Sequence, residues 1–237
     1  MNNAELILKI QDEYDSRTRE EILVNLNVAV ALGASKGLEV DRYRALPIIV
    51  NRSKHTVMSW FNRPDKKIPL VDLCMIADYL NYNIFAFFEI NNSCTAEDAS
   101  SEQMRMLFAK LKKGKPLSEK EQMLSGAVGN FLIANEQCNE KYPPDSAKIF
   151  LRAYNLRYDL DKNKIIDNLE KYYPTSEELL QHHSNERKLN VMEICACNRH
   201  TYTSWFNRSR TNVRIPLDSL CKLAIAANVD IFDLLKE

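Results

Sequence analysis

A nine-residue segment occurs twice in the chain, and each copy holds one of its only two tryptophans. His55–Arg63 reads HTVMSWFNR and His200–Arg208 reads HTYTSWFNR, so seven of nine positions are identical. The likeness continues past a loop that is two residues longer in the second copy, with Ile68–Leu70 matching Ile215–Leu217. A spacing of about 145 residues is far too long for a stacked solenoid repeat. The duplication therefore predicts two separate modules in one chain.

The composition indicates a helical protein. Only five of the 237 residues are glycine, and no run of alternating β-branched residues occurs. Sheet proteins need Gly and Asn-Gly turns to reverse the chain. With 45% hydrophobic and 27% charged residues, the profile is that of a globular protein. We expect an all-α fold, with modules over residues 1–92 and 164–237 and a helical linker or bridging region over 93–163.

Each copy of the repeated segment has the pattern of a short amphipathic helix. It follows a good N-cap residue, Ser53 or Asn198, and Pro69 or Pro216 suits the opening of the next helix. Apolar side chains recur at i, i+3 and i+4, which places them on one helix face. These stripes consist of Val57, Trp60 and Phe61, and of Tyr202, Trp205 and Phe206. We expect the stripes to pack in a core rather than to stack on single-stranded bases.

This succession of features resembles the Cro and phage-repressor class, the XRE-type helix-turn-helix family. The family shows a capped helix with Thr early and Trp late, a basic loop, a Pro-led helix with Leu-x-x-Ile-Ala, and a closing helix. The best-matched positions are Ser53, Thr56, Trp60, Asn62, Pro69, Leu73, Ile76 and Ala77, and Asn198, Thr201, Trp205, Asn207, Pro216, Leu220, Leu223 and Ala224. The resemblance covers residues 18–90 and 164–237 and implies two lambda-repressor-like helix-turn-helix domains.

The chain departs from the family pattern at three positions. The family's usual turn glycine is replaced by Asn51, which tolerates a left-handed backbone, and by Ala196, which does so at a cost. Pro47 falls within the expected scaffold helix over residues 38–50, where it would delete a hydrogen bond. These departures leave open whether both modules dock in the same geometry, or dock on DNA at all.

Charge is distributed unevenly although the formal net charge is zero. Residues 51–67 hold five basic side chains against one acid, and residues 198–214 hold four basic side chains without an acid, so each segment carries +4. The rest of the chain then carries −8. Two basic patches on an acidic body favour a localised contact with a polyanion.

The resemblance and the patches together predict a sequence-specific regulator, such as a repressor, that binds double-stranded DNA as a covalent pseudo-dimer. Helix side chains reach base edges, and flanking groups hold phosphates. The expected base-reading residues are Lys54, His55, Met58, Ser59, Arg199, His200, Thr203 and Ser204. The expected phosphate-binding residues are Thr56, Asn62, Arg63, Lys66, Lys67, Thr201, Asn207, Arg208, Arg210 and Arg214.

Other interpretations of the same residues stay open. The basic faces could be ordinary solvated helix surfaces, or the module could grip a protein, as an adaptor or nuclease inhibitor would. Cys195 and Cys197, with His200, His182 and His183 nearby, permit a weak zinc hypothesis that the first copy does not share. We expect no metal and no other cofactor. No catalytic constellation stands out, so we do not expect an enzyme.

The middle region has two predicted helices, Glu102–Leu111 and Ser118–Glu136, the second with a capping box. The basic segment Lys110–Lys115 between them is either a solvated turn or a contact to the DNA backbone. The region could set the distance between the modules or form a homodimer. No run of about 18 apolar residues and no signal-peptide pattern occur, so we expect a cytoplasmic protein with reduced thiols and no membrane contact.

Overall fold

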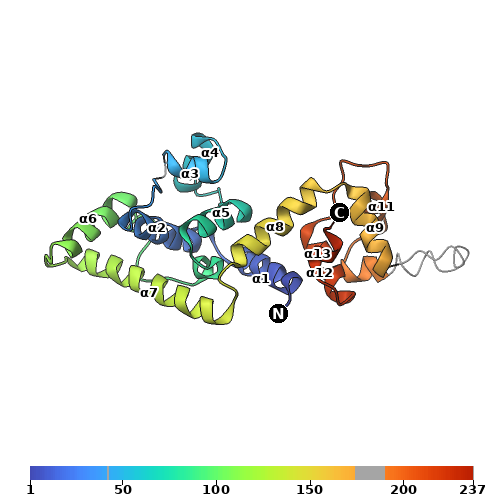
Figure 1. Ribbon diagram of the computed structural model, residues 1–237. Coiled ribbons are helices and arrows are strands. Elements are labelled where there is room, and N and C mark those ends of the chain that lie inside the picture. Colours follow the sequence, from blue (N-terminus) through green and yellow to red (C-terminus); the bar gives the residue numbers. More distant parts are fainter. Residues whose placement is uncertain (42, 174–189, 237) are drawn as a thin grey trace, which may run out of the picture. The chain divides into compact units, whose positions relative to one another are not determined.

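The computed structural model describes residues 1–41, 43–173 and 190–236, and within these ranges it consists of helices and loops without a strand (Figure 1). The expected all-α fold is confirmed. The chain divides into two compact units, one made of residues 1–11 and 149–237 and the other of residues 12–148. Two helices, α1 (Asn3–Ser16) and α8 (Ser146–Asp159), begin in one unit and end in the other. The domain boundaries expected at residues 93 and 164 stay a prediction.

The first copy of the repeat lies in the unit of residues 12–148. Its elements are α2 (Arg19–Ser35), α3 (Ala45–Ile49), α4 (Lys54–Asn62), α5 (Leu70–Leu80) and the 3₁₀ helix η1 (Ile84–Phe88). α5 starts directly after its proline, as predicted. The closing element, a helix in the family pattern, is here a 3₁₀ helix that ends at Phe88.

The second copy lies in the other unit and has the same order of elements. It consists of α9 (Lys162–Tyr172), the helical residues 190–194, α11 (Arg199–Phe206), α12 (Leu217–Ala226) and α13 (Ile231–Leu234). Its left-handed residues stand at the same points as those of the first copy. Ala196 has φ 50° where Asn51 has φ 51°, and Asn228 has φ 54° where Asn81 has φ 56°. The two copies therefore share backbone turns as well as sequence.

The helix before α4 differs from the expectation. α3 covers only five residues instead of a longer helix over 38–50. Pro47 is its third residue. The first four N–H groups of a helix have no partner within the helix, so Pro47 deletes no helical hydrogen bond, and the predicted loss was wrong.

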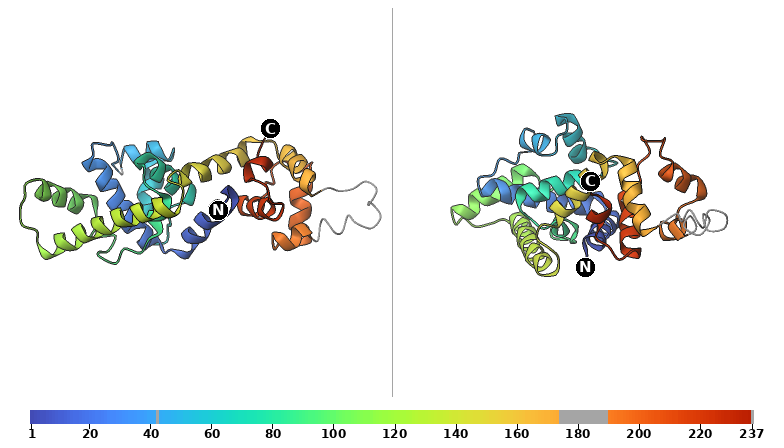
Figure 2. Two further views of the ribbon diagram at one scale, coloured as in Figure 1. Left: turned by 60° about the horizontal axis from the view of Figure 1, so that its bottom comes forward. Right: turned by 45° about the vertical axis from the view of Figure 1, so that its right-hand side comes forward.

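The middle region packs on the first copy. α6 (Ser101–Lys112) and α7 (Glu119–Lys141) contact α2, and α7 also contacts η1 (Figures 1 and 2). The phenyl ring of Phe131 on α7 meets Tyr82 and Phe87 edge-on, with centroids 5.1 and 5.6 Å apart. The predicted capping box of Ser118 and Glu121 is confirmed. The helical prediction was right, although α7 extends five residues further than expected.

Small side chains fill matching places in the two cores. Cys74 in α5 and Cys221 in α12 occupy matching positions of the repeat, and both are fully buried. All six cysteines are free thiols. In the part of the chain that the structure describes, no helix has both the length and the apolar character needed to cross a bilayer.

Candidate nucleic-acid interface

The two helices that carry the repeated sequence, α4 and α11, begin at matching caps. Ser53 Oγ accepts a hydrogen bond from the backbone N–H of Thr56 at 3.1 Å, and Asn198 Oδ1 accepts one from the N–H of Thr201 at 2.9 Å. Both predicted N-caps are confirmed. A capped first turn presents the side chains beside it in a fixed direction.

The tryptophans lie on the inner face of these helices. Trp60 is 3% exposed and Trp205 is 7% exposed, and Val57 is completely buried. The core interpretation of the tryptophans is confirmed, so neither ring is available to stack on a base. In the second copy, Tyr202 and Phe206 are half-buried and stack on each other with centroids 4.6 Å apart.

In the first copy, the expected base-reading side chains fall into two groups. Lys54 and His55 are exposed at the start of α4, and the Lys54 ammonium lies 5.2 Å from the centroid of the Tyr43 ring. Met58 and Ser59 are half-buried, and the Ser59 hydroxyl donates to the carbonyl of the residue three positions before it. The first turn of α4 therefore offers the most accessible hydrogen-bond donors.

The second copy repeats this division except at one position, where the exposed Thr203 matches the half-buried Met58. Arg199, His200 and Thr203 are exposed, whereas Ser204 is half-buried. The Thr203 hydroxyl donates to the carbonyl of Arg199 at 2.8 Å, and Ser204 Oγ accepts from the guanidinium of Arg210 at 3.3 Å. A cationic residue followed by a histidine thus forms the exposed start of both helices.

The expected phosphate-binding residues are placed less uniformly. Arg63 and Lys66 are exposed in the loop after α4. The remaining polar members are Thr56 and Asn62, which are exposed, and Thr201 and Asn207, which are half-buried. The equivalent of Arg63, Arg208, is bound within its own unit, because its guanidinium lies 2.7 Å from Asp167 and 3.0 Å from Glu170. The hydrogen bond to Asp167, with the charge of Glu170, raises the pKa of Arg208.

Two further cations of this set donate to backbone carbonyls of their own copy. Lys67 Nζ donates to the carbonyl of Tyr14 at 2.6 Å and lies 3.9 Å from the centroid of that ring. Burial lowers the pKa of Lys67. Arg214 occupies the matching position and donates to the carbonyls of Tyr158 and Leu160. Both cations thus lie at the carboxyl end of a preceding helix, α1 or α8, where its dipole favours positive charge.

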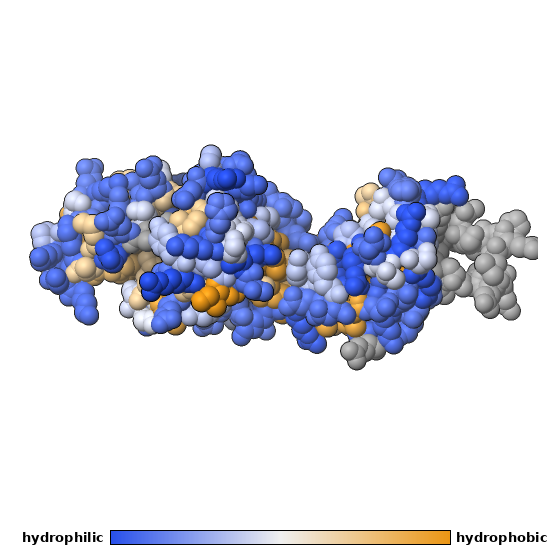
Figure 3. Space-filling model, turned by 90° about the horizontal axis from the view of Figure 1, so that it is seen from above, coloured by the Kyte–Doolittle hydropathy of each residue, from blue (hydrophilic) through white to orange (hydrophobic). Residues whose placement is uncertain are grey.

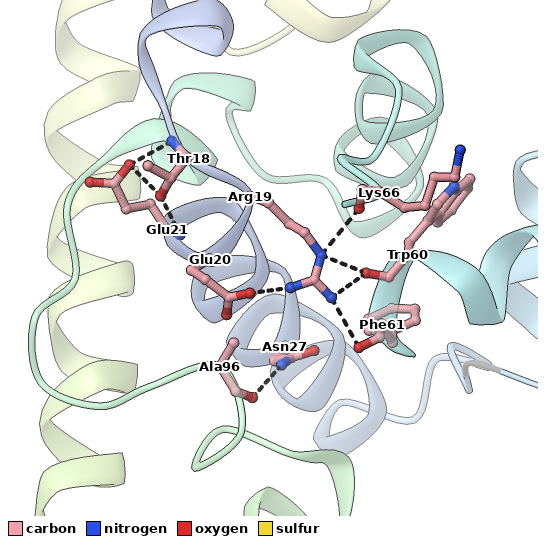
Figure 4. Close-up of polar contacts among 9 residues, drawn as sticks. All are labelled: Thr18, Arg19, Glu20, Glu21, Asn27, Trp60, Phe61, Lys66 and Ala96. Atoms are coloured by element: carbon pink, nitrogen blue, oxygen red, sulfur yellow. Dashed lines mark hydrogen bonds and ion pairs between the residues drawn. The ribbon is translucent and has the colours of Figure 1, made fainter. Parts of the chain in front are cut away.

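Two cations that sequence reasoning missed hold the opposite ends of the candidate helices. Arg19, the first residue of α2, donates to carbonyls at the end of α4 and in the loop that follows (Figure 4). Lys162, the first residue of α9, does the same at the end of α11. The residue types differ, and the pair is 143 residues apart rather than the 145 of the repeated histidines. No sequence signal therefore linked them.

The cysteines near α11 do not assemble a metal site with other described residues. Cys195 is buried, and its thiol donates to the carbonyl of Ser219 at 3.8 Å. Burial raises the pKa of Cys195 to about 12. No group of three or more metal-ligating side chains occurs within residues 1–41, 43–173 and 190–236. His182 and His183 of the zinc hypothesis lie outside these ranges.

An apolar groove of about 730 Å³ opens beside α3 in the unit that holds the first copy. Its walls come from α2, α6 and the segment between α2 and α3. Leu38, Tyr43 and Ile48 in this lining are 39%, 57% and 80% exposed. Figure 3 looks down on the end that carries α3 and α4 and shows hydrophobic atoms at a mostly hydrophilic surface. The groove contains none of the candidate DNA-binding residues.

No model of a known protein family, no curated protein and no solved structure matches the chain. The candidate interface therefore depends on the residues and geometry described above.

Proposed function

We propose that the chain binds double-stranded DNA in a sequence-specific manner, with α4 and α11 as recognition helices of two helix-turn-helix domains. The observation that carries this proposal is the repeated first turn. In both copies a cation and a histidine lie exposed beside an N-cap, while a tryptophan on the opposite face is buried. A buried anchor with exposed donors is the arrangement that a major-groove helix needs.

The donors have a chemical match in the major groove. Guanine presents two acceptors there, N7 and O6, and cationic side chains are their commonest partners. We assign base contacts first to Lys54, His55, Arg199 and His200, because these exposed side chains stand in the first turn of each helix, directly after its N-cap. The other candidates lie further along each helix. Met58, Ser59 and Ser204 are half-buried, whereas Thr203 is exposed and its hydroxyl donates to the carbonyl of Arg199.

Phosphate binding is assigned to the loop after each helix. Arg63 and Lys66 are exposed there in the first copy, and Arg210 is exposed in the second. Lys67 and Arg214 face backbone carbonyls, so we assign them to holding the loop. By binding a specific DNA site in this way, the protein would act as a regulator of transcription, for example as a repressor.

The test is a selection of bound duplexes from a random pool, followed by titration with the double variant His55→Ala/His200→Ala. We expect an enriched sequence with two half-sites, and we expect the variant to weaken binding by about 1–3 kcal/mol per lost base contact and to relax specificity. Lys164→Ala is the matched control, because Lys164 is exposed on α9 outside both basic segments.

Loss of a phosphate contact has a different signature. Lys66→Ala should lower affinity on all sequences and reduce the slope of log K against log salt by about 0.9. If no sequence is enriched and the histidine variant binds like the wild type, DNA recognition is ruled out. A protein partner then becomes the leading function, and the groove beside α3 is where its mutagenesis should begin.

A further inference from the structure

The end of α4 and the loop after it are held by one side chain. Arg19 Nη2 donates to the carbonyls of Trp60 at 2.8 Å and Phe61 at 3.0 Å. Arg19 Nε donates to the carbonyls of Trp60 and Lys66, both at 3.1 Å. Its remaining nitrogen, Nη1, pairs with Glu20 (Figure 4). The side chain is 12% exposed, so these carbonyls meet a cation that is largely shielded from water.

The second copy achieves the same connection with a lysine. Lys162 is 2% exposed. Its Nζ donates to the carbonyls of Ser204 at 3.0 Å, Asn207 at 3.0 Å and Arg210 at 2.9 Å. An ammonium group has three hydrogens and no acceptor, so all of its donors are used. The pKa of Lys162 is lowered, mainly by burial and to a smaller extent by the positive charges of Arg210 and Arg214.

The two side chains have equivalent places in their copies. Each is the first residue of the first helix, and each links the last turn of the candidate helix to the loop beyond it. The last carbonyls of a helix have no partner within the helix, and its carboxyl end carries partial negative charge. A cation placed there satisfies several of these carbonyls at once. One backbone arrangement is therefore maintained by two different residue types.

The connected loops carry the groups assigned to phosphate. Lys66 itself contributes a carbonyl to Arg19, and Arg210 contributes one to Lys162, while their charged ends remain exposed. We call Arg19 or Lys162, with the carbonyls that it binds, the clamp of its copy. Each clamp sets the position of the phosphate-binding cation relative to the helix that carries the base-reading residues. A ligand that must engage both parts binds more tightly when their spacing is fixed in advance.

We propose that Arg19 and Lys162 are positioning residues for DNA recognition, which fix the phosphate-binding loop against the recognition helix without touching DNA. This inference rests on the proposed function. These two cations differ from the exposed ones in a measurable property, the number of phosphate charges that each side chain neutralises in the complex. A buried cation that binds carbonyls displaces no counterion from a DNA phosphate. Its replacement should therefore leave the salt dependence of DNA binding unchanged.

The test compares Lys162→Met with Lys162→Arg, and Arg19→Gln with Arg19→Lys, on the selected duplex. We expect the neutral variants to bind roughly tenfold more weakly, because the loop and the helix are no longer held in the binding geometry in advance. The salt slope should stay at the wild-type value. The conservative variants should restore most of the affinity. Circular dichroism must show that each variant keeps its helix content.

A second measurement reads the clamp without DNA. Amide hydrogen exchange in the loops at 63–67 and 208–211 should accelerate in the neutral variants and recover in the conservative ones. A salt slope lower by about 0.9 would overturn the proposal, because the residue would then contact phosphate directly. Faster exchange with unchanged affinity would also overturn it, leaving a structural role alone. If the wild type binds no duplex, the proposed function fails, and exchange still reports whether the clamp exists.

Discussion

Asn25 and Asn168 make the same pair of hydrogen bonds in the two copies. The Asn25 amide donates to the carbonyls of Phe87 at 3.3 Å and Glu89 at 2.6 Å, at the end of η1. The Asn168 amide donates to those of Leu234 at 3.2 Å and Lys236 at 2.8 Å, at the end of α13. Each asparagine is almost completely buried. The first helix of each copy therefore binds the last element through one polar side chain.

Replacing either asparagine with alanine should destabilise its unit. The substitution leaves two carbonyls without their donor, and a buried unsatisfied group costs about 1–3 kcal/mol. We expect Asn25→Ala and Asn168→Ala each to lower the free energy of unfolding by about 2 kcal/mol, measured by urea titration. Asn212→Ala, at an exposed position, is the control and should change it by less than about 0.5 kcal/mol. Equal effects of all three would contradict the assigned role.

These asparagines show what the sequence could and could not predict. The repeat was visible where residue identities are dense, from His55 and His200 onward, and the caps and prolines near it were predicted correctly. The separation between equivalent residues is 143 at Asn25 and Asn168 but 145 at the histidines. A comparison at one fixed spacing therefore loses the first helix of each copy.

The structural correspondence between the copies also includes α1 and α8, the helices that precede them. The hydroxyl of Tyr14 on α1 donates to the carbonyl of Ile68 at 2.7 Å, and Nε of Arg157 on α8 donates to the equivalent carbonyl of Ile215 at 2.7 Å. A phenol and a guanidinium share no sequence signal, although both present a donor at the same point. The packing of α6 and α7 on α2 was equally hidden, because it depends on contacts between residues far apart in the chain. Exposure and ion pairing of the candidate site residues needed the folded chain for the same reason.

The left-handed turn in the second copy should be strained. Ala196 has φ 50°, a conformation that costs an L-residue with a Cβ about 1–2 kcal/mol. Its side chain is exposed, so Ala196→Gly removes few contacts. We expect this substitution to raise the free energy of unfolding by up to about 1 kcal/mol. Ala109→Gly, at an exposed position inside α6, is the control and should lower it by a similar amount. Destabilisation by both would show that the turn is not strained.

Acid should weaken the region around α6 and α7. The hydrogen bonds of Lys120 and Thr95 lower the pKa of Asp98 to about 2, and those of Lys110 and Ser118 lower the pKa of Glu121 to about 2. A carboxyl group whose pKa is lower in the folded state stabilises that state above its unfolded pKa, near 4. This stabilisation is lost as the pH falls from about 4.5 towards 2. Urea unfolding at pH 6 and pH 3 measures the difference.

The variant Asp98→Asn/Glu121→Gln provides the comparison for this acid effect. Its two side chains no longer titrate, so its stability should change less between pH 6 and pH 3 than that of the wild type. An equal loss in both proteins would place the acid sensitivity in other carboxyl groups.

If the chain binds DNA as proposed, Arg63 and Arg208 should contribute unequally despite their matching positions. The guanidinium of Arg208 must leave Asp167 and Glu170 before it can bind a phosphate. An exposed ion pair is worth up to about 1 kcal/mol, which corresponds to about a fivefold change in affinity. The loss of DNA affinity caused by Arg208→Ala should therefore be smaller than the loss caused by Arg63→Ala, by a factor of up to about five. Electrophoretic mobility titrations on the selected duplex measure both.

The acidic partners of Arg208 allow a direct check of this inequality. In the background Asp167→Asn/Glu170→Gln, the guanidinium is released, and Arg208→Ala should then cost as much as Arg63→Ala does. Because the two neutral substitutions also reduce repulsion from DNA, the effect of Arg208→Ala is compared within each background, which isolates the coupling. The same small effect of Arg208→Ala in both backgrounds would show that the ion pair does not limit this arginine, and that its loop lies away from the phosphates.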